Sequence, residues 1–252
     1  MVYKWDVRIP SLSGDKPRRA YLYLPESYFI DSHRRYPVLY MFDGHNVFFD
    51  EDATYGKSWG MKKYMDKSGK DLIIVAVECN HEGTRRLVEY SPITFRNHTL
   101  GTIHGRGRDY MNWLVYELKP YIDQRLRTLP DRENTIICGS SMGGLMSLYA
   151  VTQYNHVFQR AACLSPSIWV SPRKIHNMLA RTPAMPDTTI YMDYGGNELG
   201  RHDANHSALS DAVNMLLKKY VNLTFRIVPG GEHSEASWEK QIPIFMECLG
   251  IE

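Results

Sequence analysis

The sequence lacks the features that mark several common classes of protein. Of its 252 residues, 30 are Lys or Arg and 28 are Asp or Glu, so neither sign of charge dominates and the formal net charge is +2. The longest clean apolar run, residues 72–77, is far shorter than the roughly 20 residues that span a bilayer. Without a basic block or a long apolar run, the composition excludes nucleic-acid, membrane, fibrous and disordered classes.

Cysteine is scarce, and its spacing does not indicate metal binding. Cys79, Cys138, Cys163 and Cys248 form no Cys-x-x-Cys pair, so a zinc or redox motif of that kind is not expected. Three of the four end or lie in apolar runs, where a free cysteine packs as a small hydrophobic side chain. The first residues also lack the basic-then-apolar pattern of a signal peptide. Buried, reduced thiols and a cytoplasmic location are therefore predicted.

Short runs of β-branched and aromatic residues alternate with amphipathic stretches along the chain. Residues 2–9 and 18–24 predict two strands around the turn-forming Ser13-Gly14-Asp15. Helical periodicity follows Tyr110, Leu145 and Leu209, and Pro120 is expected to kink or interrupt the first of these helices. Continuous apolar runs, typical of strands covered on both faces, lie at 37–42, 72–77, 135–138, 160–164, 188–192 and 223–228.

This alternation predicts an α/β fold, with a mostly parallel central sheet, antiparallel N-terminal strands and helices on both faces. No repeat, linker or break in composition divides the chain, so residues 1–252 are expected to form a single domain. Residues 80–108 have no periodicity and are expected to be a functional or covering loop, with solvated arginines such as Arg85 and Arg86. No segment is large enough for a separate lid domain.

The strongest local signal is a Gly-x-Ser-x-Gly motif at Gly139, Ser141 and Gly143. It follows an apolar β-branched run and opens an amphipathic helix, which is the strand–turn–helix setting of a nucleophile elbow. Glycine suits its two positions because a side chain there would collide with the neighbouring strand or helix. Ser141 would lie at the positive end of the next helix, where the Met142 N–H can donate to an oxyanion. A capping serine in a glycine-rich turn would have the same letters.

A serine nucleophile needs a base, which in such folds follows the nucleophile and the acid along the chain. His233 comes just past the last predicted strand, in a glycine-containing loop that suits an imidazole held over Ser141. Four other histidines lie in helical or surface patterns, where a solvated side chain is expected, namely His156, His176, His202 and His206. His98 and His104 lie in the loop at 80–108 and are candidate binding residues.

Two carboxylates are candidates for the acid that orients this base. Asp193 ends the predicted strand at 188–192, and Glu198 lies beyond the flexible Gly195-Gly196 turn and could reach back to the histidine. The pattern alone leaves both open, and either could instead complement the dipole of the next helix.

A second oxyanion donor is expected from the loop after the strand at 37–42. Gly44 allows a close approach of the backbone there, so the N–H of His45 is the first candidate and that of Asn46 the second. A simple Asp-Gly turn would have the same residues.

Seven segments together resemble the putative-esterase branch of the α/β-hydrolases, which includes enterochelin-type esterases, esterase D proteins and feruloyl or acetyl-xylan esterases. The resemblance covers residues 21–249, nearly the whole chain. The segments that carry it are 40–46 (YMFDGHN), 89–92 (EYSP), 117–123 (ELKPYID), 139–145 (GSSMGGL), 164–169 (LSPSIW), 194–198 (YGGNE) and 231–233 (GEH).

The resemblance implies an α/β-hydrolase fold and favours one choice at each open position. The acid of such families lies in a Gly-x-x-Asp/Glu turn, which matches Glu198 and makes Asp193 the runner-up. The second oxyanion donor follows an Asp-Gly or His-Gly pair, which matches His45. Asp43 stands where many lipases carry histidine, so lipase details of the oxyanion site need not transfer.

The predicted function is a serine carboxylesterase that acts on short acyl, sugar or phenolic esters through a Ser141–His233–Glu198 triad and an acyl-enzyme. No metal and no organic cofactor is expected. Asn46, Phe48, Trp169 and Tyr194 are the predicted substrate-pocket residues, because an aromatic rim suits a sugar ring or a phenolic group.

The expected partner is a small-molecule ester, with no nucleic acid and no membrane. The sequence does not indicate a homo-oligomer and does not exclude one. An acyltransferase or thioesterase with the same triad, and a hydrolase-like protein that only binds, are the alternative functions.

Overall fold

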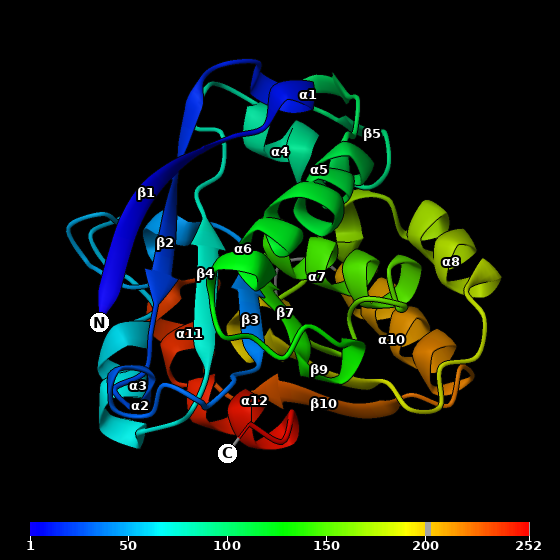
Figure 1. Ribbon diagram of the computed structural model, residues 1–252. Coiled ribbons are helices and arrows are strands. Elements are labelled where there is room, and N and C mark those ends of the chain that lie inside the picture. The colour runs from blue at the N-terminus through cyan, green and yellow to red at the C-terminus, as the bar shows by residue number, and fades with distance from the viewer. Residues whose placement is uncertain (200–202, 252) are drawn as a thin grey trace.

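An eight-stranded sheet forms the centre of the structure, a computed structural model that describes residues 1–199 and 203–251 (Figure 1). The strand order is β1-β2-β4-β3-β7-β8-β9-β10, and β5 and β6 form a separate hairpin. The strands are β1 (Val2–Arg8), β2 (Pro17–Tyr23), β3 (Val38–Met41), β4 (Ile73–Val77), β5 (Phe95–Asn97), β6 (Gly101–Ile103), β7 (Thr135–Ser140), β8 (Arg160–Leu164), β9 (Thr189–Gly195) and β10 (Asn222–Val228).

Helices connect the strands. The α-helices are α1 (Pro10–Ser13), α2 (Ser27–Ile30), α3 (Met61–Ser68), α4 (Arg85–Glu89), α5 (Gly107–Trp113), α6 (Lys119–Arg125), α7 (Met142–Gln153), α8 (Pro172–Arg181), α9 (Gly196–Leu199), α10 (Asp203–Leu217), α11 (Glu235–Glu239) and α12 (Ile242–Cys248). Short 3-10 turns are η1 (Gly44–Asn46), η3 (Arg132–Asn134) and η4 (Ile168–Val170), and η2 (Leu114–Leu118) is a π-helical turn.

The strand directions confirm the predicted mixed sheet. Strands β4, β3, β7, β8, β9 and β10 are parallel neighbours, whereas β1 pairs with β2, and β2 with β4, in antiparallel fashion. All the parallel strands therefore end at one edge, and the loops that follow them lie together there.

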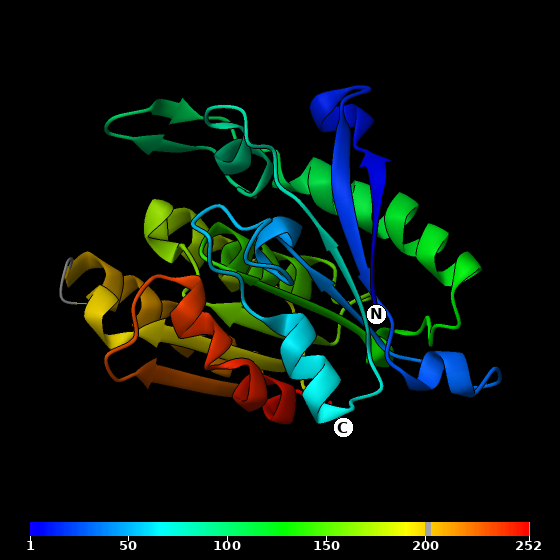
Figure 2. The same cartoon turned by 90° about the vertical axis from the view of Figure 1, so that its left-hand side faces the viewer.

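Alternate residues of each central strand enter two different cores. In β3, Val38 and Tyr40 pack with α5, α7, α8 and α10, whereas Leu39 and Met41 pack on the opposite face with α3 and α12. Figure 2 shows these two helical layers on either side of the sheet. Because both faces are covered, the strands are continuous apolar runs, as the sequence indicated.

Pro120 was expected to kink or interrupt its helix, and the α-helix is interrupted just before it. The chain stays helical from α5 to α6, but the π-helical turn η2 directly precedes α6, which carries the proline at its start. Residues 80–108, expected to be an irregular loop, contain α4 and the β5–β6 hairpin, which extends from the body of the molecule in Figure 2.

A buried ion pair fixes α4 to the sheet. Arg18 of β2 donates two hydrogen bonds to the Glu89 carboxylate, at 3.0 and 2.8 Å, and only 5% and 2% of the two side chains are exposed. Glu89 also accepts a hydrogen bond from the Asn80 N–H at 2.7 Å. The Glu89 carboxylate thus holds both ends of residues 80–89, the loop after β4 together with α4.

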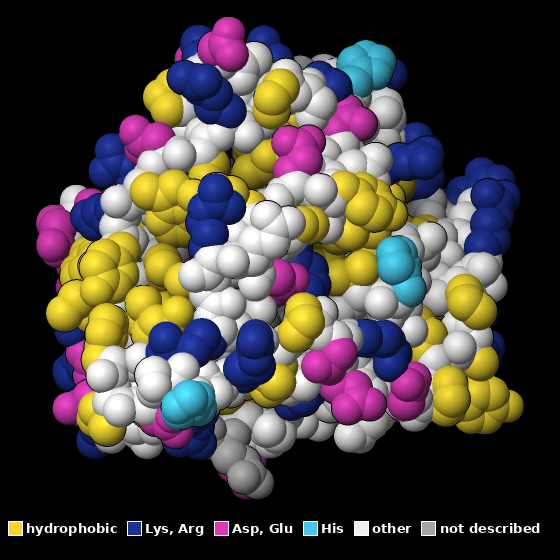
Figure 3. All heavy atoms as spheres, viewed as in Figure 1, with side chains coloured by type: hydrophobic (Ala, Val, Ile, Leu, Met, Phe, Trp, Pro, Cys, Tyr) yellow, Lys and Arg dark blue, Asp and Glu magenta, His cyan; other side chains and the backbone are white. Residues whose placement is uncertain are grey.

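The mixed charge of the surface and the free thiols agree with the expectations from the composition. Figure 3 shows Lys and Arg side chains interspersed with Asp and Glu over the face seen in Figure 1. Cys79, Cys138 and Cys163 are buried free thiols, and Cys248 is half-buried. Within the described part of the chain, no helix combines the length and apolar character that crossing a bilayer requires.

Removing the charge of Glu89 should destabilise the protein strongly. Glu89→Gln leaves the Arg18 guanidinium buried without a counter-charge, and we expect the free energy of unfolding to fall by about 3 kcal/mol in urea titrations. Glu82→Gln is the matched control, because Glu82 pairs with Lys16 at the surface, with 59% of its side chain exposed, and its loss should have little effect on the free energy of unfolding. Equal costs for the two variants would contradict the role of the buried pair.

Candidate active site

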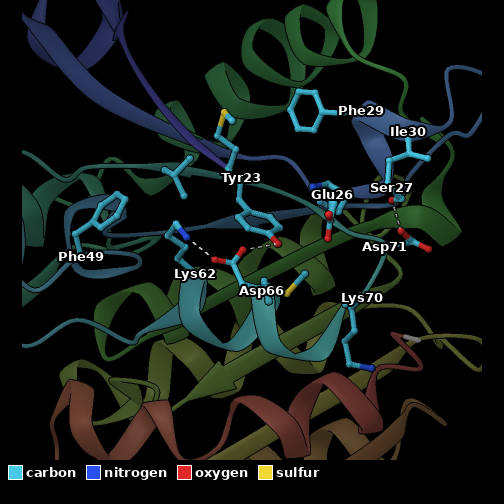
Figure 4. Close-up of a pocket in the computed structure, with 15 residues that line it drawn as sticks. Tyr23, Glu26, Ser27, Phe29, Ile30, Phe49, Lys62, Asp66, Lys70 and Asp71 are labelled. Carbon is cyan, nitrogen blue, oxygen red and sulfur yellow. Dashed lines mark hydrogen bonds and ion pairs between the residues drawn. The ribbon is translucent and has the colours of Figure 1, made fainter.

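A cavity of about 460 Å³ lies at the carboxyl edge of the parallel strands and contains both Ser141 and His233. A larger one, of about 770 Å³, lies between β2, α2 and α3, where Tyr23, Lys62 and Asp66 point toward one another (Figure 4). The residues that line the larger cavity include no histidine or cysteine. The smaller cavity is therefore the candidate active site.

Ser141 occupies the sharp turn between β7 and α7. Its backbone has φ 58° and ψ −122°, a conformation that non-glycine residues rarely adopt and that costs of order 1–3 kcal/mol. The turn can close only with glycine at position 139, because a Cβ there would lie 2.7 Å from the carbonyl carbon and oxygen of Gly143. The Ser141 N–H donates to the Leu164 carbonyl at 3.0 Å, and its Oγ lies 3.4 Å from Ser167 Oγ.

His233 follows β10 and has its ring fixed on two sides. Its Nδ1 lies 2.6 Å from Glu198 Oε2, and Trp238 packs against the ring edge to face with centroids 5.1 Å apart. The Glu198 side chain is buried, whereas nearly half of the His233 side chain is exposed to the cavity or solvent. A buried carboxylate at this distance orients the imidazole and stabilises its protonated form.

The second oxygen of Glu198 is held by two donors. Glu198 Oε1 accepts hydrogen bonds from Ser165 Oγ at 2.7 Å and from the Gly195 N–H at 3.0 Å. Ser165 in turn accepts a hydrogen bond from Trp238 Nε1 at 3.1 Å. The carboxylate is thus aimed at His233 by partners from the loop after β8, from β9 and from α11.

Asp193, the runner-up acid, lies elsewhere. Its oxygens accept hydrogen bonds from the Tyr191 hydroxyl at 2.9 Å and from the Ser165 N–H at 3.2 Å. Burial raises the pKa of Asp193 to about 7, against the lowering effect of these two hydrogen bonds. The structure therefore brings Glu198, and not Asp193, against His233.

Two backbone N–H groups are available at the cavity. Among the described residues, no acceptor pairs with the N–H of Met142, the first residue of α7, or with that of His45 in η1. The N–H of Asn46 is already bonded to the Asp43 carbonyl at 2.8 Å. Of the two residues considered for the second oxyanion donor, His45 alone keeps a free N–H.

The loop that carries His45 is held by an ion pair that sequence reasoning missed. Asp43 has φ 54°, and its buried carboxylate receives two hydrogen bonds from Arg86 of α4, at 2.8 and 2.7 Å. Burial alone would raise the pKa of Asp43, but the Arg86 guanidinium lowers it overall. Arg86 is therefore a paired residue of the cavity wall, and the expectation that it is solvated is wrong.

The predicted pocket residues are only partly brought together. Asn46 lines the cavity and bonds to Glu235 Oε1 through its Nδ2 at 3.1 Å. The prediction that Phe48 and Tyr194 line the substrate pocket is wrong. Both side chains are buried in the hydrophobic cores, and Phe48 packs against Tyr21. Trp169 is half-exposed on η4 and does not line the cavity with Ser141.

Glu235 is a cavity residue that the sequence did not reveal. It lies two residues beyond His233, is buried, and has a pKa raised by burial. The spacing of residues in the sequence does not indicate the contact of Glu235 with Asn46, or that of Arg86 with Asp43. Both contacts form only when loops from different strands meet.

Of the other histidines considered, the structure places none at this site. His98 and His104 do not line the cavity, and His202 lies outside the described residues.

Comparison with known proteins identifies the family of this chain. The sequence model of the family described as "Putative esterase" matches residues 11–245. Two curated relatives are an uncharacterised protein, YbbA, of Bacillus subtilis, 26% identical over 63% of this chain, and the esterase Rv1288 of Mycobacterium tuberculosis, 25% identical over 85% of it. The chain spans 61% and 43% of the lengths of these two relatives.

A solved structure shares the fold over the full length of the chain. A ferulic acid esterase superposes with a TM-score of 0.71 at 17% sequence identity, covering 100% of this chain and 97% of its own. The predicted α/β-hydrolase fold is confirmed.

The raised pKa of Asp193 predicts a pH-dependent stability. Between pH 4 and 7 the native carboxyl keeps a proton that the unfolded chain releases, so the free energy of unfolding falls as the pH rises. Asp193→Asn has no carboxyl proton to release, so its stability should not fall in this way. In urea titrations, its free energy of unfolding minus that of wild type should rise by about 3 kcal/mol from pH 4 to pH 7. Asp187→Asn, at an exposed residue whose pKa is lowered by Arg132, should show no such increase. Parallel pH profiles for Asp193→Asn and wild type would contradict the assignment.

Proposed function

This chain belongs to the putative esterase family, and we propose that it hydrolyses carboxylic esters with Ser141 as nucleophile, His233 as base and Glu198 as the acid that orients the base. One observation carries the proposal: a serine in a strained strand–helix turn shares a cavity with a histidine whose Nδ1 is 2.6 Å from a buried carboxylate. Esterase Rv1288 is a relative that is named for this activity.

Acylation begins when Ser141 Oγ attacks the ester carbonyl and passes its proton to His233 Nε2. Glu198 stabilises the resulting imidazolium through Nδ1, which is the nitrogen it contacts. The carbonyl oxygen becomes an oxyanion and accepts hydrogen bonds from the N–H groups of Met142 and His45. These donors are oriented before the reaction, so little reorganisation is needed as the charge develops.

The tetrahedral intermediate then collapses. His233 gives its proton to the leaving alkoxide, the C–O bond breaks, and Ser141 carries the acyl group. In the second half, a water molecule gives a proton to His233 and attacks the acyl carbon, and the same proton returns to Ser141 Oγ as the acid leaves. The alcohol and the carboxylic acid are the two products, and the reaction as proposed needs no external redox partner.

The cavity wall supports a small, polar ester. Its lining contains few apolar side chains, and its volume of about 460 Å³ suits a short acyl group on a sugar alcohol, or a phenolic acyl group. Tyr55 lines this cavity and exposes most of its ring, which offers a face for an aromatic or sugar ring. A phenolic substrate is also the one named for the ferulic acid esterase of similar fold.

Substitutions at the nucleophile and at the two candidate acids test their roles. Ser141→Ala should reduce kcat on p-nitrophenyl acetate at least about 1000-fold and abolish labelling by a fluorophosphonate probe. Glu198→Gln should reduce kcat at least about 100-fold, because it no longer stabilises the imidazolium, whereas Asp193→Asn should retain activity within a few-fold at neutral pH. Circular dichroism checks folding of each variant. Failure of wild-type Ser141 to react with the probe would favour a protein that only binds.

The polar wall should also limit acyl length. We expect kcat/KM on p-nitrophenyl esters to fall at least about 10-fold from acetate to decanoate, because a long alkyl chain would displace water from polar groups without replacing its hydrogen bonds. An acetyl thioester, offered as the matched control for the leaving group, should react more slowly than the oxygen ester. A rise in kcat/KM with chain length, or faster turnover of the thioester, would favour a different substrate class.

A further inference from the structure

Three metal-ligating side chains meet on the wall of the Ser141 cavity. His45 follows β3, and Cys79 and His81 follow β4. These strands are parallel neighbours in which Met41 pairs with Ala76, so the segments beyond them leave the sheet side by side. The donor atoms of the three side chains all lie within 4.8 Å of one another.

Each histidine in this cluster has one ring nitrogen engaged on the outside. His45 Nε2 lies 3.1 Å from Thr54 Oγ1, and His81 Nε2 lies 3.7 Å from Glu78 Oε2. His45 Nδ1 is buried and has no hydrogen-bond partner. The two rings pack edge to face, with centroids 4.5 Å apart. Metal-binding histidines commonly have this arrangement, in which an outer oxygen fixes the ring and the other nitrogen binds the ion.

Two imidazoles and a thiol form a set of ligands that suits Zn²⁺. At the usual Zn–N and Zn–S distances, ligand atoms lie about 3.5 Å apart, and rotation of the half-exposed His81 side chain can close the remaining gap. All three residues line the cavity that contains Ser141, so the fourth position of a tetrahedral ion would face that cavity.

A second cavity reinforces the attraction for a cation. It has a volume of about 450 Å³ and shares His45 and His81 with the first. Its wall carries four carboxylates and one arginine, namely Asp6, Glu51, Asp52, Glu78 and Arg19. Asp6 is paired with Arg19 and Asp52 with Lys4, so Glu51 and Glu78 are the groups of this wall that attract a cation to the two histidines.

We propose that His45, Cys79 and His81 form a binding site for Zn²⁺ and that the bound ion inhibits ester hydrolysis at Ser141. On binding, the Cys79 thiol releases its proton to solvent and a Zn–S bond forms, with no change of oxidation state. The ion and its water ligand then occupy the cavity beside the N–H of His45, where the ester carbonyl would bind. Inhibition rests on the proposed function, whereas binding of the ion does not.

Binding is tested on the full chain after chelator treatment, by competition for Zn²⁺ with a chromogenic chelator. Wild type should bind one ion, and His81→Ala should weaken binding at least about 10-fold. His176→Ala is the matched control, because His176 also pairs with a carboxylate and has a side chain 43% exposed, against 52% for His81. Co²⁺ should give a thiolate charge-transfer band with wild type that Cys79→Ser abolishes.

Inhibition is tested on p-nitrophenyl acetate hydrolysis with and without a chelator. Zn²⁺ should inhibit wild type reversibly, and His81→Ala should need at least about 10-fold more Zn²⁺ for half-inhibition, with each protein compared with its own activity in the metal-free state. Unchanged Zn²⁺ binding in both His81→Ala and Cys79→Ser would overturn the site and place the ion elsewhere, for example on His233. An inactive wild-type enzyme would contradict the proposed function, whereas the chelator competition would still decide the metal site.

Discussion

The backbone conformation of Ser141 is the constraint on which the candidate site depends. A residue at φ 58° is stable only where its surroundings compensate for the strain, and here β7 is buried between β3 and β8. The turn sets the start of α7 and hence the direction of the Met142 N–H. It also brings the Ser141 carbonyl to the N–H of Ser167, which ties the serine to the loop after β8. The other functional groups are arranged around this turn by their own strands.

Four buried carboxyl groups lie in or near the candidate site, and their environments differ; Asp43 and Glu235 line the cavity, whereas Glu198 contacts His233 and Asp193 lies behind Ser165. Glu198 receives two hydrogen bonds on one oxygen and contacts His233 with the other, so its carboxyl group is held in one orientation. Asp43 is paired with Arg86, which keeps its pKa low despite burial. Asp193 and Glu235 have no such counter-charge, and burial raises their pKa values. The pKa values of Asp43 and Asp193 are thus shifted in opposite directions, although the two groups are chemically alike, because they contact different groups.

Much of the fold could be predicted from the sequence, because strands covered on both faces are continuous apolar runs and the helices between them are periodic. The positions of Ser141 and His233 at the ends of β7 and β10 follow from the same patterns. The pair formed by Asp43 and Arg86 could not be predicted, since it joins loops after different strands and has no fixed spacing. Phe48 and Tyr194 were wrong as pocket residues, because an aromatic residue beside a loop has the same local pattern whether it faces the core or the cavity.

Two residues that hold Asp43 come from the segment at 80–108, which also forms part of the cavity wall. Arg86 binds its carboxylate, and the Tyr90 hydroxyl accepts a hydrogen bond from its N–H at 3.2 Å. In many enzymes, surface loops diverge freely and change the substrate while the catalytic framework stays intact. Here the same segment lines the cavity and holds the loop that carries His45. Its exchange between related proteins would therefore alter turnover together with substrate choice. Evolution of new specificity is therefore expected to proceed through loops that leave Asp43 untouched, such as the one that carries Tyr55.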